Sequence, residues 1–500
     1  MKNLFTLLLI CACLLGAQAG MANGLTVTNI NYDSQTHWIT LDVSWQNAWH
    51  VNEGFHDGIW VFAKYKAANS NQWKHADLTG ATLEADGMTF RNDGVGFIMY
   101  PSTISDEQFD VTTTTITIKD VEPMTAAGQP ELNPSFKVFG VEMVYIPEGN
   151  FYAGDTQSQR TIREEAENSP KLVTETSDRI YFQTGSGGSS YFDLLPEFYP
   201  NGYDEYYIMK YEVSQGLYAE FLNMLNSEQQ QALTGHDLSS AAEYQPYAMS
   251  PYTVANFYVA SNSEFNIQDF NYIVGPEAFE AGRLTYRVDY DLSDDPGSEG
   301  DGFGKAATML TPMHLQNLLD WAGLRPMTEL QYEKAARGFD EPVPNEFAWG
   351  TESFTQILSV QNEGFETETV SNTGEGLANF ERSPLRVGFA ATENTDRLGS
   401  GASYFGVMNL SDNVLELTLP INIGMESDYL STLGDGMIEP DASLTSRQYE
   451  LDVMYRGGAI LNLDNSVSYR SDNLISNEYE ADKSDFVDYT WLRMGGRGVR

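Results

Sequence analysis

Cysteine is nearly absent from this chain. The sequence has two cysteines in 500 residues, Cys11 and Cys13, and both lie in a segment that we expect to be removed. Without them the mature chain can form no disulfide, and it has no thiolate to act as a nucleophile or to bind a metal. These absences exclude disulfide scaffolds, cysteine-dependent catalysis and thiolate metal sites.

Long hydrophobic runs are also missing. The apolar run at residues 4–16 is too short to span a bilayer, which takes about 20 residues, and no later run approaches that length. It follows a short charged start and precedes Ala17-Gln18-Ala19, a pattern typical of a signal peptide and its cleavage site. We therefore expect residues 1–19 to be a signal peptide and the mature chain to begin near Gly20. A lipoprotein anchored at Cys13 fits less well, because the apolar run continues past it. The prediction is a secreted protein without a transmembrane segment, extracellular or at the cell surface, with the periplasm as the alternative.

Basic residues are scarce as well. The chain has 28 Lys and Arg against 71 Asp and Glu, a formal net charge of -43 at pH 7. Such a charge repels nucleic acids and anionic membranes, so we expect neither as a partner. Two interpretations stay open: the acid surplus keeps an exported protein soluble, or clustered carboxylates attract divalent cations.

Residues 22–123 alternate apolar and polar side chains as β-strands do. In the segment 38–45 one face has Ile39, Leu41, Val43 and Trp45. In the segment 58–67 one face has Ile59, Val61 and Ala63, and the other has Trp60 and Phe62. Residues 111–118 are β-branched throughout, which also favours a strand. Together these strands predict an N-terminal all-β immunoglobulin-like sandwich, followed by a linker at residues 124–137.

From residue 138 onward, short strands alternate with a few helices. Thr311, with a proline at the next position, marks the start of one helix. Thr328 and Gln331 form a capping box for a second helix, and Gly338 ends it. Ser214 is expected to cap a third helix. We expect residues 138–500 to form one large α+β domain with insertions.

Seven short motifs follow one another in this domain. They are 143–151 (MVYIPEGNF), 207–213 (YIMKYEV), 324–338 (LRPMTE to AARG), 347–350 (FAWG), 406–416 (GVMN to E), 455–458 (YRGG) and 495–497 (GGR). In content and order they resemble motifs of the formylglycine-generating-enzyme (sulfatase-modifying-factor) family. The resemblance implies an irregular fold of the C-type lectin-like kind, in which the insertion at 235–305 has no counterpart.

Compared with that family, this chain lacks the residues on which the chemistry of the family depends. Active members bind copper(I) through two cysteines and oxidise a substrate cysteine with oxygen. The matching positions lie near Asn462 and Val467, and neither side chain replaces a thiolate for copper(I). Another branch holds iron with an H-x3-H-x-E motif, a spacing that none of the six histidines shows. We therefore expect no copper, no iron and no catalytic residues, as in a pseudoenzyme.

Three histidines need an interpretation. His50 and His56, with Glu53 between them, form the closest pair in the sequence. Loop or surface histidines are the preferred interpretation of this pair, and a metal pair is the alternative. His314 lies near the start of the helix that follows Thr311, where we expect it on the polar face.

Calcium is the cofactor that the resemblance leaves open. The family places a calcium ion in the loop that corresponds here to Asn409, Asp412, Val414 and Glu416. Asn409 and Glu416 would donate side-chain oxygens, and Asp412 and Val414 would donate carbonyls, ligands that calcium accepts in loose geometry. The alternative is an ordinary turn in which Glu416 forms an ion pair. A second family site would need an asparagine near Asn379.

Three functions follow from these observations. The leading hypothesis is an exported, non-catalytic structural, assembly or display protein, calcium-stabilised, with protein partners or self-assembly. The second is an extracellular ligand-recognition protein of the lectin-fold type, in which residues 462–489 contact a surface ligand. The third is a divergent non-haem metal oxidase that uses His50 and His56.

Overall fold

The computed structural model describes a mixed but mainly β-sheet protein. The residues it describes are 24–124, 128–131, 133–155, 161–164, 169–183, 190–234, 245–246, 273–275, 279–280, 283–290, 302–379, 383–392, 394–421, 432–439, 452–458, 475–476 and 494–500. The expected signal peptide and most of the insertion at 235–305 lie outside them. Within these ranges, no helix combines the length and apolar character needed to cross a membrane.

One large antiparallel sheet organises the described part of the chain. Its twelve strands include the path β21-β30-β15-β9-β3-β2-β8-β5, with β1, β4, β6 and β7 paired alongside. Their bounds are β1 (Thr26–Asp33), β2 (Trp38–Asn52), β3 (Phe55–Lys66), β4 (Lys74–His75), β5 (Thr82–Glu84), β6 (Met88–Asn92), β7 (Phe97–Pro101), β8 (Ser105–Lys119), β9 (Ser135–Ile146), β15 (Tyr206–Met209), β21 (Arg325–Pro326) and β30 (Gly498–Val499).

The N-terminal strands form two layers around a common core. β1, β2, β5 and β8 pair in one layer, and β3, β6, β7 and β9 pair in the other. The layers are joined at the β2–β3 hairpin, and side chains from both form one buried cluster that includes Leu41, Val61, Met99 and Ile116. The prediction of an all-β N-terminal part is confirmed. Its immunoglobulin-like topology stays a prediction.

β3 is buried on both faces. Ile59, Val61 and Ala63 belong to the core between the two layers. Trp60 and Phe62 belong to a second core with helices of the C-terminal part. The predicted alternation along this strand is therefore confirmed, and the two faces bind the strand to two different halves of the chain.

The large sheet continues from the N-terminal part into the C-terminal part. β9 pairs with β3 through ten residues, and β15 pairs with the other edge of β9. Residues 135–137 of the expected linker are therefore part of β9 and of the large sheet. Because β9 has neighbours on both edges, the two halves of the chain share backbone hydrogen bonds as well as a core.

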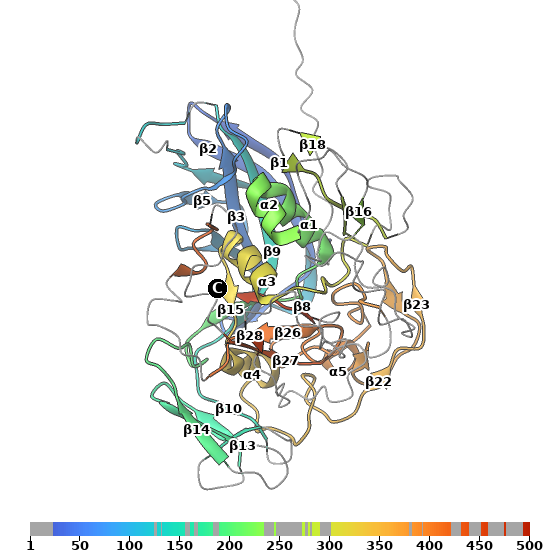
Figure 1. Ribbon diagram of the computed structural model, residues 1–500. Helices are drawn as coiled ribbons and strands as arrows, with labels where there is room; N and C mark the ends of the chain where they lie inside the picture. The colour runs from blue at the N-terminus through green and yellow to red at the C-terminus, as the bar shows by residue number, and fades with distance from the viewer. Residues whose placement is uncertain are drawn as a thin grey trace, which may run out of the picture.

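The three predicted helices are present and begin where their caps predict. α1 (Gln215–Met224) is capped by Ser214, α3 (Pro312–Trp321) by Thr311, and α4 (Glu329–Arg337) by Thr328, and α4 ends at Gly338. α1 and α3 pack on the face of the sheet that has Trp60 (Figure 1). Two shorter helices are α2 (Ser227–Thr234) and α5 (Arg397–Ser400).

Smaller sheets complete the C-terminal part. A four-stranded sheet with the strand order β28-β27-β26-β29 positions the candidate site. The bounds of its strands are β26 (Leu415–Thr418), β27 (Asp452–Arg456), β28 (Ile475–Ser476) and β29 (Met494–Gly495). The others are formed by β10 (Phe151–Ala153), β11 (Ile162–Arg163), β12 (Lys171–Val173), β13 (Arg179–Gln183), β14 (Ser190–Leu194), β16 (Gln245–Pro246), β17 (Ile273–Gly275), β18 (Phe279–Glu280), β19 (Arg283–Leu284), β20 (Arg287–Val288), β22 (Thr355–Gln356), β23 (Val360–Gln361), β24 (Thr369–Val370) and β25 (Leu377–Ala378).

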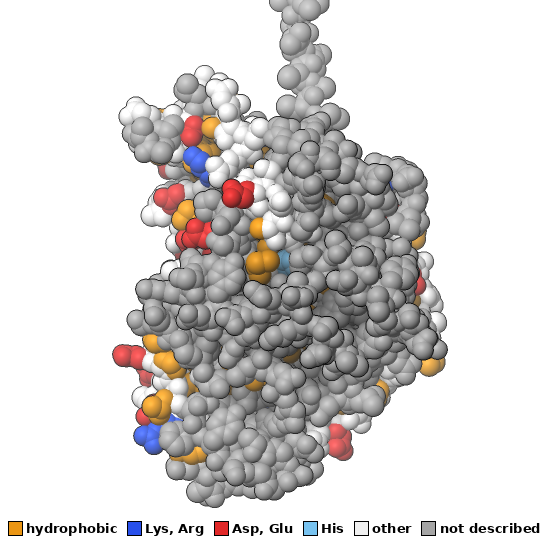
Figure 2. Space-filling model, in the orientation of Figure 1, with side chains coloured by type: hydrophobic (Ala, Val, Ile, Leu, Met, Phe, Trp, Pro, Cys, Tyr) orange, Lys and Arg blue, Asp and Glu red, His pale blue; other side chains and the backbone are white. Residues whose placement is uncertain are grey.

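Only part of the surface shown in Figure 2 belongs to described residues. On the face shown in Figure 2, the described Asp and Glu side chains stand in separate small groups, with a few Lys or Arg among them. This distribution agrees with the solubility interpretation of the net charge.

Candidate functional site

The loop predicted to bind calcium forms a tight turn that leads into β26. Asn409 and Asn413 have positive φ angles of 61 and 67 degrees, a left-handed conformation that asparagine tolerates better than most residues. Asp412, which replaces a glycine of the family motif, is not among the described residues with a positive φ. Aspartate therefore fits this position without left-handed strain.

Asn409 and Asp412 hold each other in this turn. The Asn409 side-chain oxygen accepts a hydrogen bond from the Gly388 N–H at 2.7 Å, and its Nδ2 donates to Asp412 Oδ1 at 3.0 Å. Asp412 Oδ2 accepts from the Asn379 N–H at 3.1 Å. Burial raises the pKa of Asp412 to about 7, so this carboxyl group is partly protonated at neutral pH.

Glu212 is a member of the site that the sequence did not single out. Its carboxylate accepts from Asn413 Nδ2 at 2.8 Å and from the Val414 N–H at 3.1 Å. It is fully buried, and burial raises its pKa well above the usual range. Glu212 lies within the 207–213 motif, but only the folded chain brings it to Asn413, 201 residues away.

Glu416 is paired with Arg497 at the centre of the site. Arg497 Nε and Nη2 donate to the two carboxylate oxygens at 2.7 and 2.6 Å. The remaining guanidinium donors reach the carbonyl oxygens of Met209, Lys210 and Met408. Both side chains are fully buried. Burial raises the pKa of Glu416, and the neighbouring Arg497 acts in the opposite direction.

The arrangement of these side chains bears on calcium. Arg497 occupies both oxygens of Glu416, and the Gly388 N–H occupies the oxygen of Asn409, so in this conformation the expected side-chain ligands already have protein partners. Among the described residues, no three His, Cys, Asp or Glu side chains converge as a metal-binding group. The side chains do not fit a calcium ion in this arrangement, and calcium binding stays a prediction of the resemblance.

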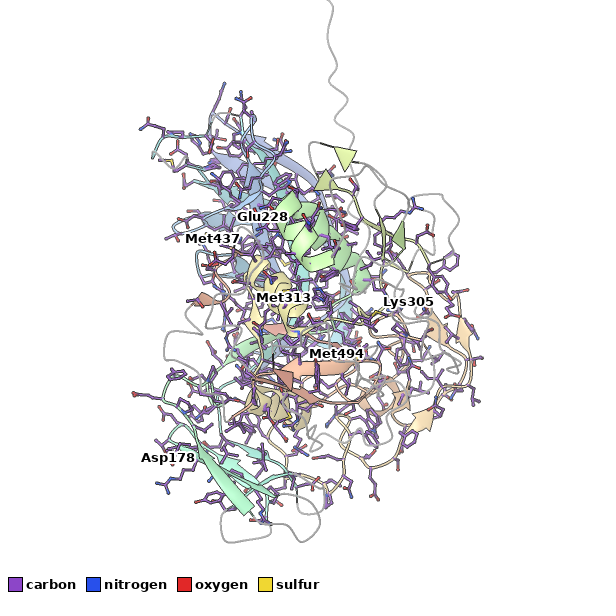
Figure 3. The ribbon with its side chains drawn as sticks, viewed as in Figure 1. Asp178, Glu228, Lys305, Met313, Met437 and Met494 are labelled. Carbon is purple, nitrogen blue, oxygen red and sulfur yellow. The ribbon has the colours of Figure 1, made fainter. Side chains whose placement is uncertain are left out.

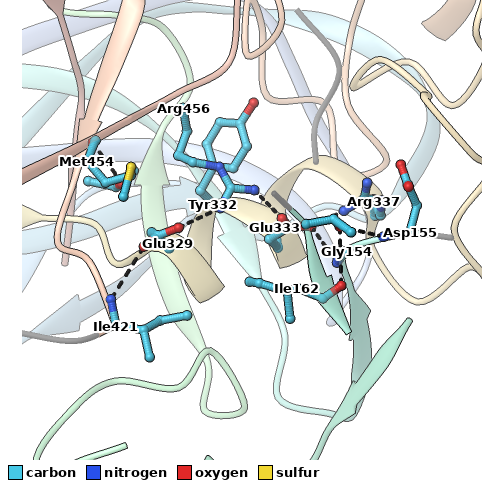
Figure 4. A network of polar contacts seen from close by, with 12 residues as sticks. Gly154, Asp155, Ile162, Glu329, Tyr332, Glu333, Arg337, Ile421, Met454 and Arg456 are labelled. Atoms are coloured by element: carbon cyan, nitrogen blue, oxygen red, sulfur yellow. Dashed lines mark hydrogen bonds and ion pairs between the residues drawn. The ribbon is translucent and has the colours of Figure 1, made fainter. Parts of the chain in front are cut away.

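A second buried ion-pair network lies beside the site. Arg456, in β27, pairs with Glu329 and Glu333 of α4, and Glu333 also pairs with Arg337 (Figure 4). Arg337 in turn donates to Glu346 at 2.5 Å. Charged groups buried in this way need partners on every side. The network thus links α4, β27 and the segment before residue 347 into one rigid unit.

His50 and His56 are buried, so the preferred interpretation of loop or surface histidines is wrong. The two residues are directly opposite each other in the β2–β3 hairpin, with exposed fractions of 2% and 0%. His50 Nδ1 lies 2.7 Å from the Pro101 carbonyl oxygen, and His56 Nε2 lies 2.9 Å from the Tyr207 hydroxyl. Burial lowers the pKa of His56 to about 3. The turn between β2 and β3 is short, so the two strands form a hairpin. The paired strands place both imidazole rings inside the protein.

His314 is also buried, contrary to the expected position on the polar face of its helix. Its Nε2 lies 2.9 Å from the Leu233 carbonyl oxygen, and its Nδ1 completes the capping box with Thr311. The helix packs this side against α2 rather than against solvent. His314 therefore has a structural role at the start of α3.

A groove lies near the candidate site, between the β2–β3 hairpin and the segment 391–408. It has a volume of about 320 Å³. Its lining combines the aromatic rings of Trp49, Phe55 and Tyr404 with polar side chains such as Asn47, Gln108 and Arg397. Gly406 approaches the Trp49 ring closely, since a Cβ atom there would lie 3.2 Å from it. Lys210 also lines the groove, and about half of the lining residues are polar or charged.

Several sequence-predicted positions lie outside the described residues. These are Asn462 and Val467, at the positions of the family cysteines, and most of the recognition stretch at 462–489. Asn379, named for a second calcium site, is described, and its backbone N–H contacts Asp412.

Comparisons with known proteins add little to this description. No family model matches the chain, and no curated protein matches it. Among solved structures, the chain is similar to the pilus 2b backbone protein of group B streptococcus, at 14% sequence identity and a TM-score of 0.11. That match covers 38% of this chain and 86% of the other. A likeness at this TM-score identifies neither the family nor the function of this chain.

Proposed function

We propose that this chain is an exported, non-catalytic structural, assembly or display protein, built on a scaffold like that of formylglycine-generating enzymes. The single observation that carries the proposal is the pairing of buried charges around the candidate site. Glu416 is paired with Arg497, Glu329 is paired with Arg456, and Glu333 is paired with both Arg456 and Arg337. Side chains committed to such pairs stabilise a scaffold and are not available to a substrate.

The sequence supports the same proposal. The only cysteines are Cys11 and Cys13, in the expected signal peptide. A mature chain without them has no thiolate ligand for copper(I) and no thiol nucleophile. The shared sheet supports a rigid spacer, because β9 pairs with β3 of the N-terminal layers through ten residues and with β15 of the C-terminal part through four.

Oxygen consumption tests this proposal directly. The mature protein is incubated with copper(I) or iron(II) and a cysteine-containing peptide, and oxygen uptake and aldehyde formation are followed. We expect no oxygen uptake and no aldehyde formation above the level seen with the metal ion and the peptide alone. Sustained turnover by the protein would overturn the proposal and favour the oxidase hypothesis.

Ligand recognition is the second candidate, and the groove at Trp49 favours it. Aromatic rings that line a groove beside amide, hydroxyl and guanidinium groups suit a sugar or a peptide, since such ligands offer both apolar faces and hydrogen-bonding groups.

Binding to an oligosaccharide array and a peptide library tests the second candidate. Trp49→Ala should reduce any specific binding at least about tenfold, as expected for an aromatic anchor. Trp38→Ala is the matched control, because Trp38 is 37% exposed on the same strand but does not line the groove. Equal loss in both variants, or no binding by the wild type, would refute recognition at this groove.

A further inference from the structure

A lysine and two carboxylates from three neighbouring strands meet in the large sheet. Asp57 is in β3, Glu142 is in β9, and Lys210 directly follows β15. β9 lies between the other two strands, with Asp57 opposite Val144 and the Lys210 N–H bonded to the Glu142 carbonyl oxygen. Cross-strand neighbours point to the same face of a sheet. The register therefore brings these three side chains together.

The three groups are in contact and shielded from water. Lys210 Nζ lies 2.8 Å from Asp57 Oδ2 and 3.4 Å from Glu142 Oε2. The exposed fractions of the side chains are 7% for Lys210, 1% for Asp57 and 3% for Glu142. The second oxygen of Asp57 accepts from the Trp49 N–H at 2.9 Å, so the carboxyl group is held with one oxygen toward the lysine.

The placement of the cluster, with two carboxyl groups in contact with one amine, suits a condensation. Burial acts to lower the pKa of Lys210, but Asp57, Tyr211 and Glu142 raise it overall, so the amine is freed only when its proton passes to a neighbouring carboxylate. Two carboxyl groups share one ammonium group, so one carboxyl can stay protonated without an unpaired buried charge. Burial raises the pKa of Asp57, which favours the neutral acid at that position. Glu142 is then the group that can accept a proton from Lys210, and a carboxylate in contact with the reacting amine is suited to general acid–base catalysis.

We infer that Lys210 and Asp57 become joined by an isopeptide bond, with Glu142 as the proton carrier. Glu142 takes one proton from the ammonium group, and the freed amine attacks Cγ of the protonated Asp57. The Nζ–Cγ bond forms and the bond from Cγ to the hydroxyl breaks. The hydroxyl leaves as water with a second proton from Nζ, passed through Glu142. The amide retains the third proton, and no oxidant or other co-reactant is needed.

Other buried lysines lack one part of this arrangement. Lys305, labelled in Figure 3, also lies between two carboxylates, Glu363 at 3.5 Å and Glu368 at 3.0 Å. The side chain of Glu363 is 39% exposed, so water competes at that site. Lys64 donates to the carbonyl oxygens of Trp321 and Gly436, which cannot condense with an amine. Lys305 therefore supplies a matched control.

The bond would do what a disulfide does in other exported proteins. It would close a ring between positions 153 residues apart and tie the N-terminal layers to the C-terminal part. A covalent link of this kind constrains the unfolded chain strongly. The mature chain is expected to lack cysteine, so no disulfide could provide that constraint. The inference does not depend on the proposed function.

The intact mass of the full mature chain tests the inference. With the N-terminus determined by sequencing, we expect a mass lower than that of the sequence by one water, and a branched peptide joining Lys210 to Asp57 after digestion. Lys210→Arg, Asp57→Ala and Glu142→Gln should have their full sequence masses, while Lys305→Arg should keep the deficit. Asp57→Asn should still react, releasing ammonia, and give the same final mass as the wild type.

A denaturing gel gives a second measurement that needs no substitution in the cluster. A protease site is inserted at Gly128, which is exposed and lies between the two joined positions. After cleavage, the two fragments should migrate together under reducing, denaturing conditions. A wild-type chain with its full sequence mass, whose fragments separate on the gel, would show that the cluster is an ion pair only and would overturn the inference.

Discussion

Arg497 offers the sharpest test of how the candidate site is held together. In Arg497→Ala the carboxylate of Glu416 stays fully buried but loses its counter-charge and both hydrogen bonds. The carbonyl oxygens of Met209, Lys210 and Met408 lose the donors that Arg497 supplies to them. Removing one partner of a buried ion pair costs about 3–5 kcal/mol. We expect a loss in that range, measured by urea denaturation with linear extrapolation.

Two companion variants separate charge from geometry. Arg497→Lys keeps the positive charge but cannot reproduce the two parallel hydrogen bonds of the guanidinium group, so we expect an intermediate loss. Arg497→Met combined with Glu416→Leu removes both charges. Such a replacement of a buried pair by apolar groups is often neutral, so the double variant should be more stable than Arg497→Ala.

The pH dependence gives a further check on the same variant. Without Arg497, burial raises the pKa of Glu416 further, so this group binds a proton in the folded state over a wider pH range than in the unfolded state. The stability deficit of Arg497→Ala should therefore shrink as the pH falls toward 5 and grow toward 8. A deficit below about 1 kcal/mol, which is typical of exposed pairs, and independent of pH would refute the reasoning.

Arg456→Met leaves Glu329 without its buried counter-charge and leaves Glu333 paired with Arg337 alone. This change should cost about 3–5 kcal/mol in the same urea titration, and an unchanged midpoint would contradict the network. The pKa of Asp412 is about 7 in the folded protein and about 3.9 in the unfolded chain, so the folded state binds more protons between these values. The free energy of unfolding should therefore fall as the pH rises from about 4 to about 7. Asp412→Ala should make that slope shallower, and an identical slope in both proteins would count against this assignment. Chelation with EDTA should leave the urea midpoint unchanged, because the side-chain oxygens expected to bind calcium already have protein partners. A lower midpoint that calcium restores and magnesium does not would instead favour the predicted calcium site.

Predictions that depend on contacts between residues close in the sequence are confirmed, and the prediction that depends on contacts between distant residues is wrong. Thr311 and Thr328 could be identified as helix caps because a cap bonds to a residue three positions away. The spacing of His50 and His56 predicts loop or surface histidines, and this prediction is wrong because their burial depends on what covers the hairpin. Tyr207, which lies 2.9 Å from His56, is 151 residues away in the sequence.

The sequence by itself determined the caps, the alternation along β2 and β3, and the scarcity of cysteine, which is confined to Cys11 and Cys13. These features need only local hydrogen bonds, a period of two residues or a residue count. The tertiary structure alone decided that Glu416 meets Arg497 and that Asp57 meets Lys210. Strand register and sheet order bring these charges together, and neither is encoded in the spacing of residues along the chain.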